Sequence, residues 1–380
     1  MNLKLCVFSN DPIISYFNKG EIKSRYFNPG NIFDEIHIIT FIDDDIDSSK
    51  VKMLAGNATL KIYSMGNLNT LNLKNKKEKI LDLVKEINPD VIRAYNSKLE
   101  GWLAAYCSKK LCKPFFVSIH AQYDGYRKLM RKKNFSKYLI LQYSRKFIEP
   151  FVLKNADKIT GVYKIIESYI YDIIKQQPEI LYNKIELDRF KPKQKRIFNK
   201  KPIILSVSRL TSQKNHHIII QAIKNLDVHL QIIGDGELLY SLQKLVKELS
   251  VENKVSFIKS VNNNEIQTYY QSADIFALAY DPKIEGVPIP VLEALASGMP
   301  IVIPEPEQGY SDGLEDAALF AKLDSDSFKE QFIKIIDDKE CREILCVNAI
   351  KKSRHFDTNN IENREKEIYQ ELIDTNNTRI

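Results

Sequence analysis

Short runs of apolar, often β-branched residues alternate along this chain with longer stretches in which apolar positions recur at helical spacing. In the first half the short runs predict seven strands, at 3–8, 36–41, 59–63, 91–94, 115–120, 158–162 and 180–182. Helical patterns lie between them at 74–87, 98–111, 125–154 and 164–175. The second half predicts six more strands, at 203–207, 230–233, 255–258, 275–279, 301–303 and 318–320. Strands that alternate with helices are typical of doubly wound parallel sheets.

The pattern is interrupted between 186 and 201, where the chain becomes polar and clusters lysine and arginine around Pro192. A chain of 380 residues is also longer than one hydrophobic core usually supports. We therefore predict two Rossmann-like α/β domains, residues 1–190 and 191–355. A C-terminal segment, 356–380, follows them and contains a sparse amphipathic helix near 361–372.

Composition narrows the class of protein. No apolar run reaches the roughly 20 residues that a membrane-spanning helix needs, and the N-terminal residues are typical of a strand and not of a secretory signal. The five cysteines are odd in number and include no Cys-x-x-Cys pair. This favours reduced thiols in a cytoplasmic protein and no zinc site.

The net charge of +7 is unevenly distributed. Residues 1–190 contain 31 Lys and Arg against 21 Asp and Glu, or +10, and residues 191–380 contain 25 against 28, or −3. Eight basic residues and no acidic one lie between 127 and 147, interleaved with Leu, Ile, Phe and Tyr. The segment fits a helix at an anionic membrane surface and equally a helix packed on the sheet with a solvated basic side. Nucleic acid is not an expected partner, because no base-reading motif accompanies the charge.

The most informative stretch begins at Glu285 and ends at Glu293, two carboxylates eight positions apart with two prolines and a glycine between them. Proline fits the first turn of a helix, where backbone N–H groups have no intrahelical partner. The free N–H groups and the positive end of that helix favour an anion. The two carboxylates would then flank the anion, an arrangement suited to a sugar that carries a diphosphate.

This stretch resembles the Glu-x7-Glu signature of the family-four retaining glycosyltransferases, also called glycosyl transferases group 1, and the match continues as Ala-x-Ala-x-Gly-x-Pro through residues 294–300. The resemblance implies the α/β GT-B fold, two Rossmann-like domains facing across a cleft with the C-terminal helix crossing back to the first. It implies that Glu285 contacts the donor sugar and Glu293 the ribose hydroxyls. The N–H groups of Gly286 and Val287 would meet the sugar or phosphate, although Pro288 replaces a frequent glycine and removes one donor.

Arg209 and Lys214 follow the strand predicted at 203–207, and we expect Lys214 in the first turn of the next helix. Arginine binds phosphate oxygens as a fork, and lysine acts as a mobile point charge. Their Arg-Leu-x-x-x-Lys spacing resembles the family element that holds the donor diphosphate, which implies that both stabilise the leaving charge. Gly234 belongs to a Gly-Asp-Gly turn that resembles the family's loop beside the nucleotide.

The first half resembles the family more loosely. His120 ends a predicted strand, where its ring is placed to hydrogen-bond a sugar hydroxyl; the alternative is a satisfied core histidine. The family's N-terminal Gly-Gly loop is absent, and Gly20 takes its place as the candidate for acceptor binding, with an ordinary surface loop as the alternative. No catalytic metal is expected, because GT-B enzymes generally work without one and no Asp-x-Asp donor motif stands out.

The resemblance implies retaining, metal-independent transfer of a hexosyl unit from a nucleoside-diphosphate sugar to a hydroxyl acceptor. UDP or GDP is the expected nucleotide, with no other cofactor, and a sugar or lipid-linked glycan is the expected acceptor. Surface polysaccharide, lipopolysaccharide or glycolipid assembly fits this reaction, in the cytoplasm or peripherally on the inner membrane face. The alternatives are a sugar-nucleotide epimerase of the same architecture, a sugar phosphorylase, whose usual cofactor-lysine motif is not visible, and an inactive scaffold for glycan assembly.

Overall fold

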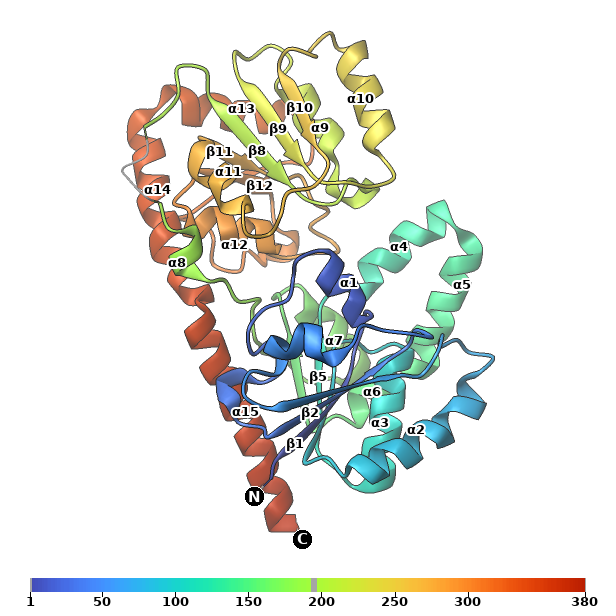
Figure 1. The fold of residues 1–380 in the computed structure, drawn as a ribbon. Coiled ribbons are helices and arrows are strands. Elements are labelled where there is room, and N and C mark those ends of the chain that lie inside the picture. The colour runs from blue at the N-terminus through green and yellow to red at the C-terminus, as the bar shows by residue number, and fades with distance from the viewer. Residues whose placement is uncertain (1, 193–196, 380) are drawn as a thin grey trace. The chain divides into compact units, whose positions relative to one another are not determined.

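The computed structural model describes residues 2–192 and 197–379. The chain divides into two compact units, Met1–Tyr182 with Ile361–Ile380, and Asn183–Asn360. Each unit contains one parallel sheet with helices between successive strands (Figure 1). The predicted α/β fold of two Rossmann-like parallel-sheet domains is therefore confirmed.

The first sheet has the strand order β3-β2-β1-β4-β5-β6-β7. Its strands are β1 Lys4–Phe8, β2 Glu35–Thr40, β3 Thr59–Ser64, β4 Val91–Ala94, β5 Phe115–Ile119, β6 Lys158–Gly161 and β7 Glu179–Ile180. The α-helices of this unit are α1 Ile13–Asn18, α2 Leu73–Ile87, α3 Leu99–Leu111, α4 Tyr123–Lys133, α5 Phe135–Tyr143, α6 Glu149–Lys154 and α7 Ile166–Ile174. Short 3-10 turns cover Pro29–Asn31 and Ser48–Ala55.

The second sheet has the order β10-β9-β8-β11-β12-β13. Its strands are β8 Ile203–Val207, β9 His229–Ile233, β10 Val255–Ile258, β11 Ile275–Ala277, β12 Ile301–Pro304 and β13 Leu319–Ala321. The α-helices are α8 Leu187–Phe190, α9 His216–Ala222, α10 Leu239–Glu248, α11 Ile266–Ser272, α12 Ile289–Ala296, α13 Ser325–Asp337 and α14 Lys339–Ser353. Three 3-10 turns cover Ser212–Lys214, Glu307–Gly309 and Arg354–Phe356.

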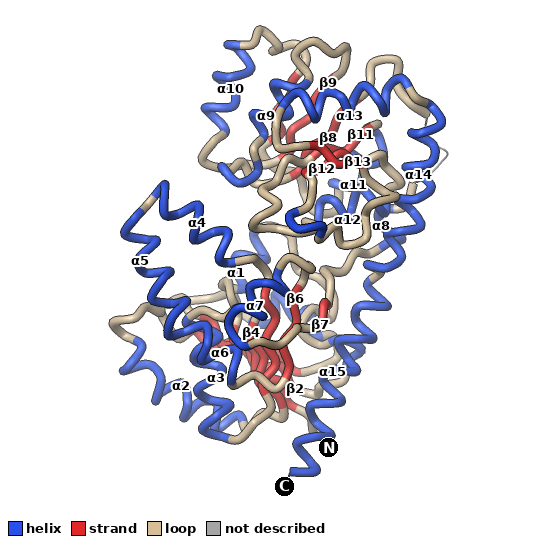
Figure 2. Tube along the Cα trace, turned by 180° about the vertical axis from the view of Figure 1, so that it is seen from behind, coloured by secondary structure: helices blue, strands red, loops and turns tan. Residues whose placement is uncertain are grey.

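The strands are apolar because both faces of each sheet are covered. In β1, Leu5 and Val7 join a core cluster that includes Ile368 and Leu372 of the C-terminal helix, α15 (Thr358–Arg379). Figures 1 and 2 show α15 on one side of the first sheet and α2 and α3 on the other. The core of the second unit gathers side chains of β8 and β9 with those of α9, α10 and α13.

The unit boundaries differ from the sequence-based ones. The first boundary falls after Tyr182 and not after residue 190, because Phe190 packs edge-on against the fully buried Tyr270 of the second unit, with ring centroids 5.7 Å apart. The second falls after Asn360 and not after 355, and α15 is longer than the predicted helix at 361–372. Residues 193–196 of the predicted linker lie outside the described residues.

The stretch predicted as helical from 125 to 154 is broken. Asn134 adopts an extended conformation (φ −153°, ψ 93°), and its side chain accepts a hydrogen bond from the Lys137 N–H, so it caps α5. A π-helical turn, Ser144–Ile148, then joins α5 to α6. Capping by Asn134 lets the chain reverse where periodicity alone indicated continuation.

Candidate functional site

The predicted donor-binding residues gather at one edge of the second sheet. Arg209 and Lys214 follow β8, Gly234 follows β9, and Glu285 to Glu293 follow β11. These three strands are neighbours, and the strand order reverses between β8 and β11. Parallel α/β sheets bind ligands outside the carboxyl ends of their strands at such a reversal. The topology therefore brings these residues to the position where this fold forms sites.

Lys214 and Glu285 form the centre of this edge. The Lys214 Nζ donates to Glu285 Oε2, and the two side chains are only 8% and 16% exposed. A buried ammonium needs such a partner, because an unpaired charge in the interior is costly. The ammonium carries three N–H donors, so donors remain for an anion beside the pair.

The sequence predicted Lys214 in the first turn of the helix that follows β8, and this prediction is wrong. Lys214 ends the 3-10 turn Ser212–Lys214, and α9 begins only at His216. The chain turns at Asn215, which has φ 43° and donates its side-chain N–H to the Ala279 carbonyl at 2.9 Å. The Asp281 N–H donates to the Gln213 carbonyl at 2.8 Å. These bonds join the loops after β8 and β11 and set Lys214 opposite Glu285.

Arg209 is an exposed cation of this edge. It lies two residues after the end of β8, and no ion pair of its guanidinium is found within the described residues. The loop that carries it is fixed by the neighbouring Leu210, whose N–H donates to the Asp235 carbonyl at 2.8 Å. The guanidinium keeps its donors available for a solvent-borne anion.

Gly234 allows the loops after β8 and β9 to pack closely. Its φ is 150°, and a Cβ built there would lie 1.9 Å from the Ser208 carbonyl oxygen. Gly236 has a similar constraint, with a built Cβ 2.5 Å from the Leu210 carbonyl oxygen. Any side chain at Gly234 would therefore displace the loop that carries Arg209.

The start of α12 provides unpaired backbone donors. Pro288 occupies the N-cap with φ −65° and ψ 153°, and Pro290 lies in the first turn. The Pro288 carbonyl accepts from the Val291 N–H at 2.9 Å. Among the hydrogen bonds of the described chain, none is donated by the N–H of Gly286 or Val287. Two N–H groups thus precede the positive end of α12, beside Glu285.

Glu293 lies on α12 and accepts a hydrogen bond from the hydroxyl of Tyr270 at 2.7 Å. Tyr270 belongs to α11 and is fully buried, and burial with the nearby Glu293 charge raises its pKa well above the ordinary value. It therefore remains a donor and holds the carboxylate. Tyr270 was not predicted from the sequence, because an aromatic residue on an amphipathic helix carries no sign that its hydroxyl meets a particular acid.

In the first unit, His120 directly follows β5, as predicted. Its ring packs edge-on against Tyr95 at 5.8 Å, and its buried Nε2 has no hydrogen-bond partner in the described structure. Burial, with a smaller contribution from the Arg93 charge, lowers the pKa of His120 to about 4. The ring is therefore neutral near pH 7, and its contact to a sugar hydroxyl stays a prediction.

Two further polar side chains, at the edge of the first sheet that carries His120, were not predicted. Asn10 follows β1 and Asn96 follows β4, where the strand order of the first sheet reverses. The Asn96 side chain donates to Asn10 Oδ1 at 2.7 Å, and Asn96 is buried. Asparagine is common in this sequence, so only its position after a central strand could have singled these two out.

The local backbone conformation explains why residue 20 is a glycine. Gly20 lies two residues after the end of α1 with φ 67°, and its N–H donates to the Phe17 carbonyl at 3.0 Å. Glycine is the usual residue where a helix ends in this conformation. The geometry explains Gly20 without an acceptor, so its acceptor role stays a prediction.

No group of three or more His, Cys, Asp or Glu side chains in the described part of the chain is arranged to hold a metal ion.

The fold, together with the edge of the second sheet that carries Arg209, Lys214 and Glu285, indicates the class of protein. Two solved structures superpose on almost the whole chain. Sucrose-phosphate synthase from Thermosynechococcus elongatus has a TM-score of 0.75 and 14% identity, and the match covers 98% of this chain and 100% of that one. Anabaena HepE in complex with UDP has a TM-score of 0.75 and 17% identity, with the same coverage. At these identities the likeness shows the fold alone. This chain has the GT-B fold.

Residues 188–354 match the family model of the glycosyl transferases group 1. This segment carries the whole donor-side edge, and the match confirms the family resemblance that was recognised from the sequence.

Curated relatives support the same family. The alpha-monoglucosyldiacylglycerol synthase of Streptococcus pneumoniae is 24% identical over 247 residues, which cover 59% of this chain and 54% of that protein. The N-acetylgalactosamine-N,N'-diacetylbacillosaminyl-diphospho-undecaprenol 4-alpha-N-acetylgalactosaminyltransferase of Campylobacter jejuni is 31% identical over 193 residues, which cover 49% and 52%. The chain thus spans about half the length of these two relatives.

Proposed function

We propose that this protein is a retaining, metal-independent glycosyltransferase that moves a hexosyl unit from a nucleoside-diphosphate sugar to a hydroxyl acceptor. The observation that carries this proposal is the Lys214–Glu285 contact at the reversal of the second sheet, in a segment that matches the family model of the glycosyl transferases group 1.

Each element of the edge has a role in the proposed reaction. The Arg209 guanidinium, the remaining Lys214 donors and the N–H groups before α12 bind the diphosphate and stabilise the charge that develops as it leaves. The bond between the sugar carbon and the diphosphate oxygen breaks, and a bond from the same carbon to the acceptor oxygen forms on the same face. The leaving phosphate takes the acceptor proton, so the step needs no protein base. Because the acceptor attacks from the face that the diphosphate leaves, the step also needs no protein nucleophile. Glu285 accepts hydrogen bonds from the donor sugar.

Glu293 is proposed to accept hydrogen bonds from the ribose. The hydrogen bond from the Tyr270 hydroxyl to its Oε2, at 2.7 Å, fixes the orientation of this carboxylate. UDP or GDP is the proposed nucleotide, and the HepE structure, which contains UDP, supports the first of these by analogy. We propose no further cofactor.

The acceptor is proposed to be a sugar or a lipid-linked glycan. The relatives' names refer to a diacylglycerol glycolipid and an undecaprenol-linked glycan, which supports a lipid-linked acceptor. In the first unit, His120 is the proposed contact to a sugar hydroxyl, because its neutral ring retains an unpaired nitrogen.

A nucleotide panel tests the donor site. We expect one of UDP, GDP, ADP and dTDP to raise the unfolding midpoint by several degrees, because a ligand at about 100 times its Kd adds roughly 2.7 kcal/mol. Arg209→Ala should lose most of this shift. Arg354→Ala removes another exposed arginine of the same unit and should keep it. If no nucleotide raises the midpoint, the inactive scaffold gains support.

Turnover tests the reaction. With the selected donor and a crude lipid-glycan acceptor, Glu285→Gln should reduce transfer by about 100-fold or more while the nucleotide-induced shift persists. Unchanged transfer in this variant would overturn the assignment of Glu285. Conversion of the donor sugar without any acceptor would instead identify an epimerase.

A further inference from the structure

The helices α4 and α5 form a helical hairpin that leaves the body of the first unit. Figures 1 and 2 show the two helices standing off the other helices of that unit. All nine residues of α5 are described, and none of their side chains is buried. A helix that covers no core needs another reason for the apolar residues that it carries.

Large apolar side chains concentrate on the outer side of this hairpin. Five are between 52% and 65% exposed: Phe135, Leu139, Ile140, Tyr143 and Phe147. They are five of the seventeen large apolar side chains exposed in the described part of the chain, and they lie within thirteen consecutive positions. The inward side carries Tyr138 and Leu141, which are half-buried, and Ile148, which is buried. A contiguous exposed apolar surface of this kind marks an interaction site.

The hairpin is also strongly basic. Six of the eight basic residues between 127 and 147 are exposed: Lys128, Arg131, Lys132, Lys133, Lys137 and Lys146. No Asp or Glu occurs from residue 125 to residue 148. We refer to these six basic and the five exposed apolar side chains together as the hairpin face.

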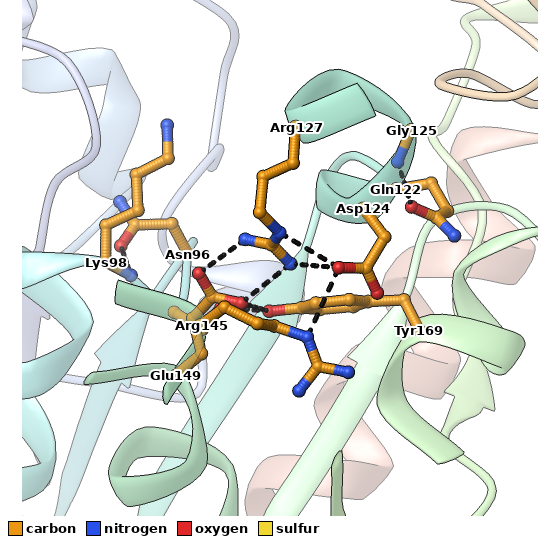
Figure 3. Close-up of polar contacts among 10 residues, drawn as sticks. Asn96, Lys98, Gln122, Asp124, Gly125, Arg127, Arg145, Glu149 and Tyr169 are labelled. Atoms are coloured by element: carbon orange, nitrogen blue, oxygen red, sulfur yellow. Dashed lines mark hydrogen bonds and ion pairs between the residues drawn. The ribbon is translucent and has the colours of Figure 1, made fainter. Parts of the chain in front are cut away.

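The two remaining arginines belong to the base of the hairpin and not to its face (Figure 3). Arg127 is buried and donates to Glu149 Oε1 at 2.8 Å and to Asp124 Oδ1 from its Nε at 2.9 Å. Arg145 donates from its Nε to the same Asp124 oxygen at 3.2 Å. The hydroxyl of Tyr169, on α7, donates to Glu149 Oε2 at 2.6 Å. This network joins α4, the π turn, α6 and α7, so the face projects from a fixed base.

We propose that the hairpin face docks this protein on an anionic lipid bilayer, with its apolar side chains entering the headgroup boundary and its lysines and arginine contacting lipid phosphates. The charge selects this occupant, because a surface with six exposed cations and no anion repels a second copy of itself. No helix in the described ranges is long and apolar enough to cross a membrane, so the contact would be peripheral. The proposal is independent of the proposed transfer reaction.

Vesicle sedimentation of the full-length chain tests the proposal. We expect co-sedimentation with vesicles of 70% phosphatidylcholine and 30% phosphatidylglycerol, weak binding to pure phosphatidylcholine, and weaker binding at 0.5 M salt. Equal binding to both vesicle compositions, or no binding to either, would overturn the proposal.

Two matched pairs of variants separate charge from apolar contact. Replacing Lys132, Lys133 and Lys137 by Gln should weaken binding about 100-fold, at about fivefold per cation near an anionic surface. The control replaces the exposed Lys247, Lys334 and Lys351 of the second unit by Gln, which removes the same charge and should change binding much less. Phe135→Ser, Ile140→Ser and Phe147→Ser together should also release the protein, whereas Leu323→Ser, Ile344→Ser and Val347→Ser should not.

The variants must retain the wild-type nucleotide-induced midpoint shift, which reports the second unit separately from the hairpin. If both members of each pair bind like the wild type, the hairpin face is not the membrane contact. If the wild type sediments as a dimer without lipid and the apolar variant does not, the face binds a second copy and the proposal is wrong. If the wild-type protein binds vesicles as expected but transfers no sugar, the proposed function is wrong and the membrane contact stands.

Discussion

At the residue scale, the donor-side edge is built from charges that depend on one another. Lys214 and Glu285 are both largely withdrawn from water, and each lowers the cost of burying the other. Glu293 accepts a hydrogen bond from the hydroxyl of the buried Tyr270, which supports its carboxylate as Lys214 supports that of Glu285. The exposed Arg209 differs from these, because its side chain is held by no ion pair in the described structure. This arrangement combines a fixed carboxylate set with one adaptable cation.

His216, two positions after Lys214, gives a pH-dependent stability. The ring is 1% exposed, and burial, followed by the charges of Lys214 and His217, lowers its pKa to about 4 from an ordinary 6.5. Below pH 6.5 the unfolded chain binds a proton that the folded chain excludes, so stability falls as pH decreases. The loss reaches about 3 kcal/mol near pH 4, at 1.36 kcal/mol per unit of pKa.

Urea unfolding at pH 7, 6, 5 and 4.5 measures this effect. His216→Gln should show a shallower decline than the wild type over this range, whatever its stability at pH 7. His355→Gln, at an exposed histidine of the same unit, is the control and should keep the wild-type slope. Parallel curves for the wild type and His216→Gln would show that His216 does not carry the dependence.

At the scale of elements, a buried polar network sets the orientation of the α4–α5 hairpin. Arg127 and Glu149 are 3% and 1% exposed, and Asp124 and Tyr169 complete their hydrogen bonds. The sequence indicated basic residues at 127–147 without distinguishing their roles. Arg127 and Arg145 are structural because they pair with acidic residues of α4 and α6. For the six cations of the hairpin face, no ion pair is found within the described residues.

Arg127→Ala should destabilise the protein by roughly 3–5 kcal/mol, because it leaves the Glu149 carboxylate buried without its cation. Denaturant unfolding measures the change. Arg131→Ala, at the next exposed arginine of α4, should stay within about 0.5 kcal/mol of the wild type. Adding Glu149→Leu to Arg127→Ala should restore much of the loss, and equal instability of the single and double variants would argue against an unpaired charge as the cause.

At the scale of the whole molecule, α15 belongs to both units of the chain. Thr358–Asn360 lies in the second unit, and the remaining residues of the helix pack on the first sheet. Tyr369 is fully buried there, with its ring edge-on to Phe33 at 5.1 Å and to Phe116 at 5.4 Å. The end of the chain therefore completes the core formed by its beginning.

Tyr369→Ala should cost about 3–5 kcal/mol, the usual penalty for removing a buried aromatic side chain. Hydrogen exchange should show faster exchange in β1, β2 and β5 than in the second sheet, because the lost contacts are in the first core. Gln370→Ala alters the adjacent exposed position and should leave exchange unchanged. A uniform acceleration in both sheets would mean that the two units unfold together.

Most strands and the family resemblance could be predicted from local sequence patterns. Strands buried on both faces need continuous apolar runs, so β4, β8 and β10 were predicted with their observed bounds. The Glu285–Glu293 spacing, the Arg-Leu-x-x-x-Lys element and the Gly-x-Gly turn are local patterns, and a local pattern can be read without knowing the fold.

The tertiary structure, in contrast, is needed to know which side chains meet. The contacts Lys214–Glu285, Tyr270–Glu293 and Arg127–Glu149 join residues 71, 23 and 22 positions apart, and no periodicity encodes such pairings. It also placed Lys214 before α9, ended the first unit at Tyr182 and left α5 without a buried side chain. The physical reason is that a pairing depends on strand order and loop conformation, which the whole chain settles together.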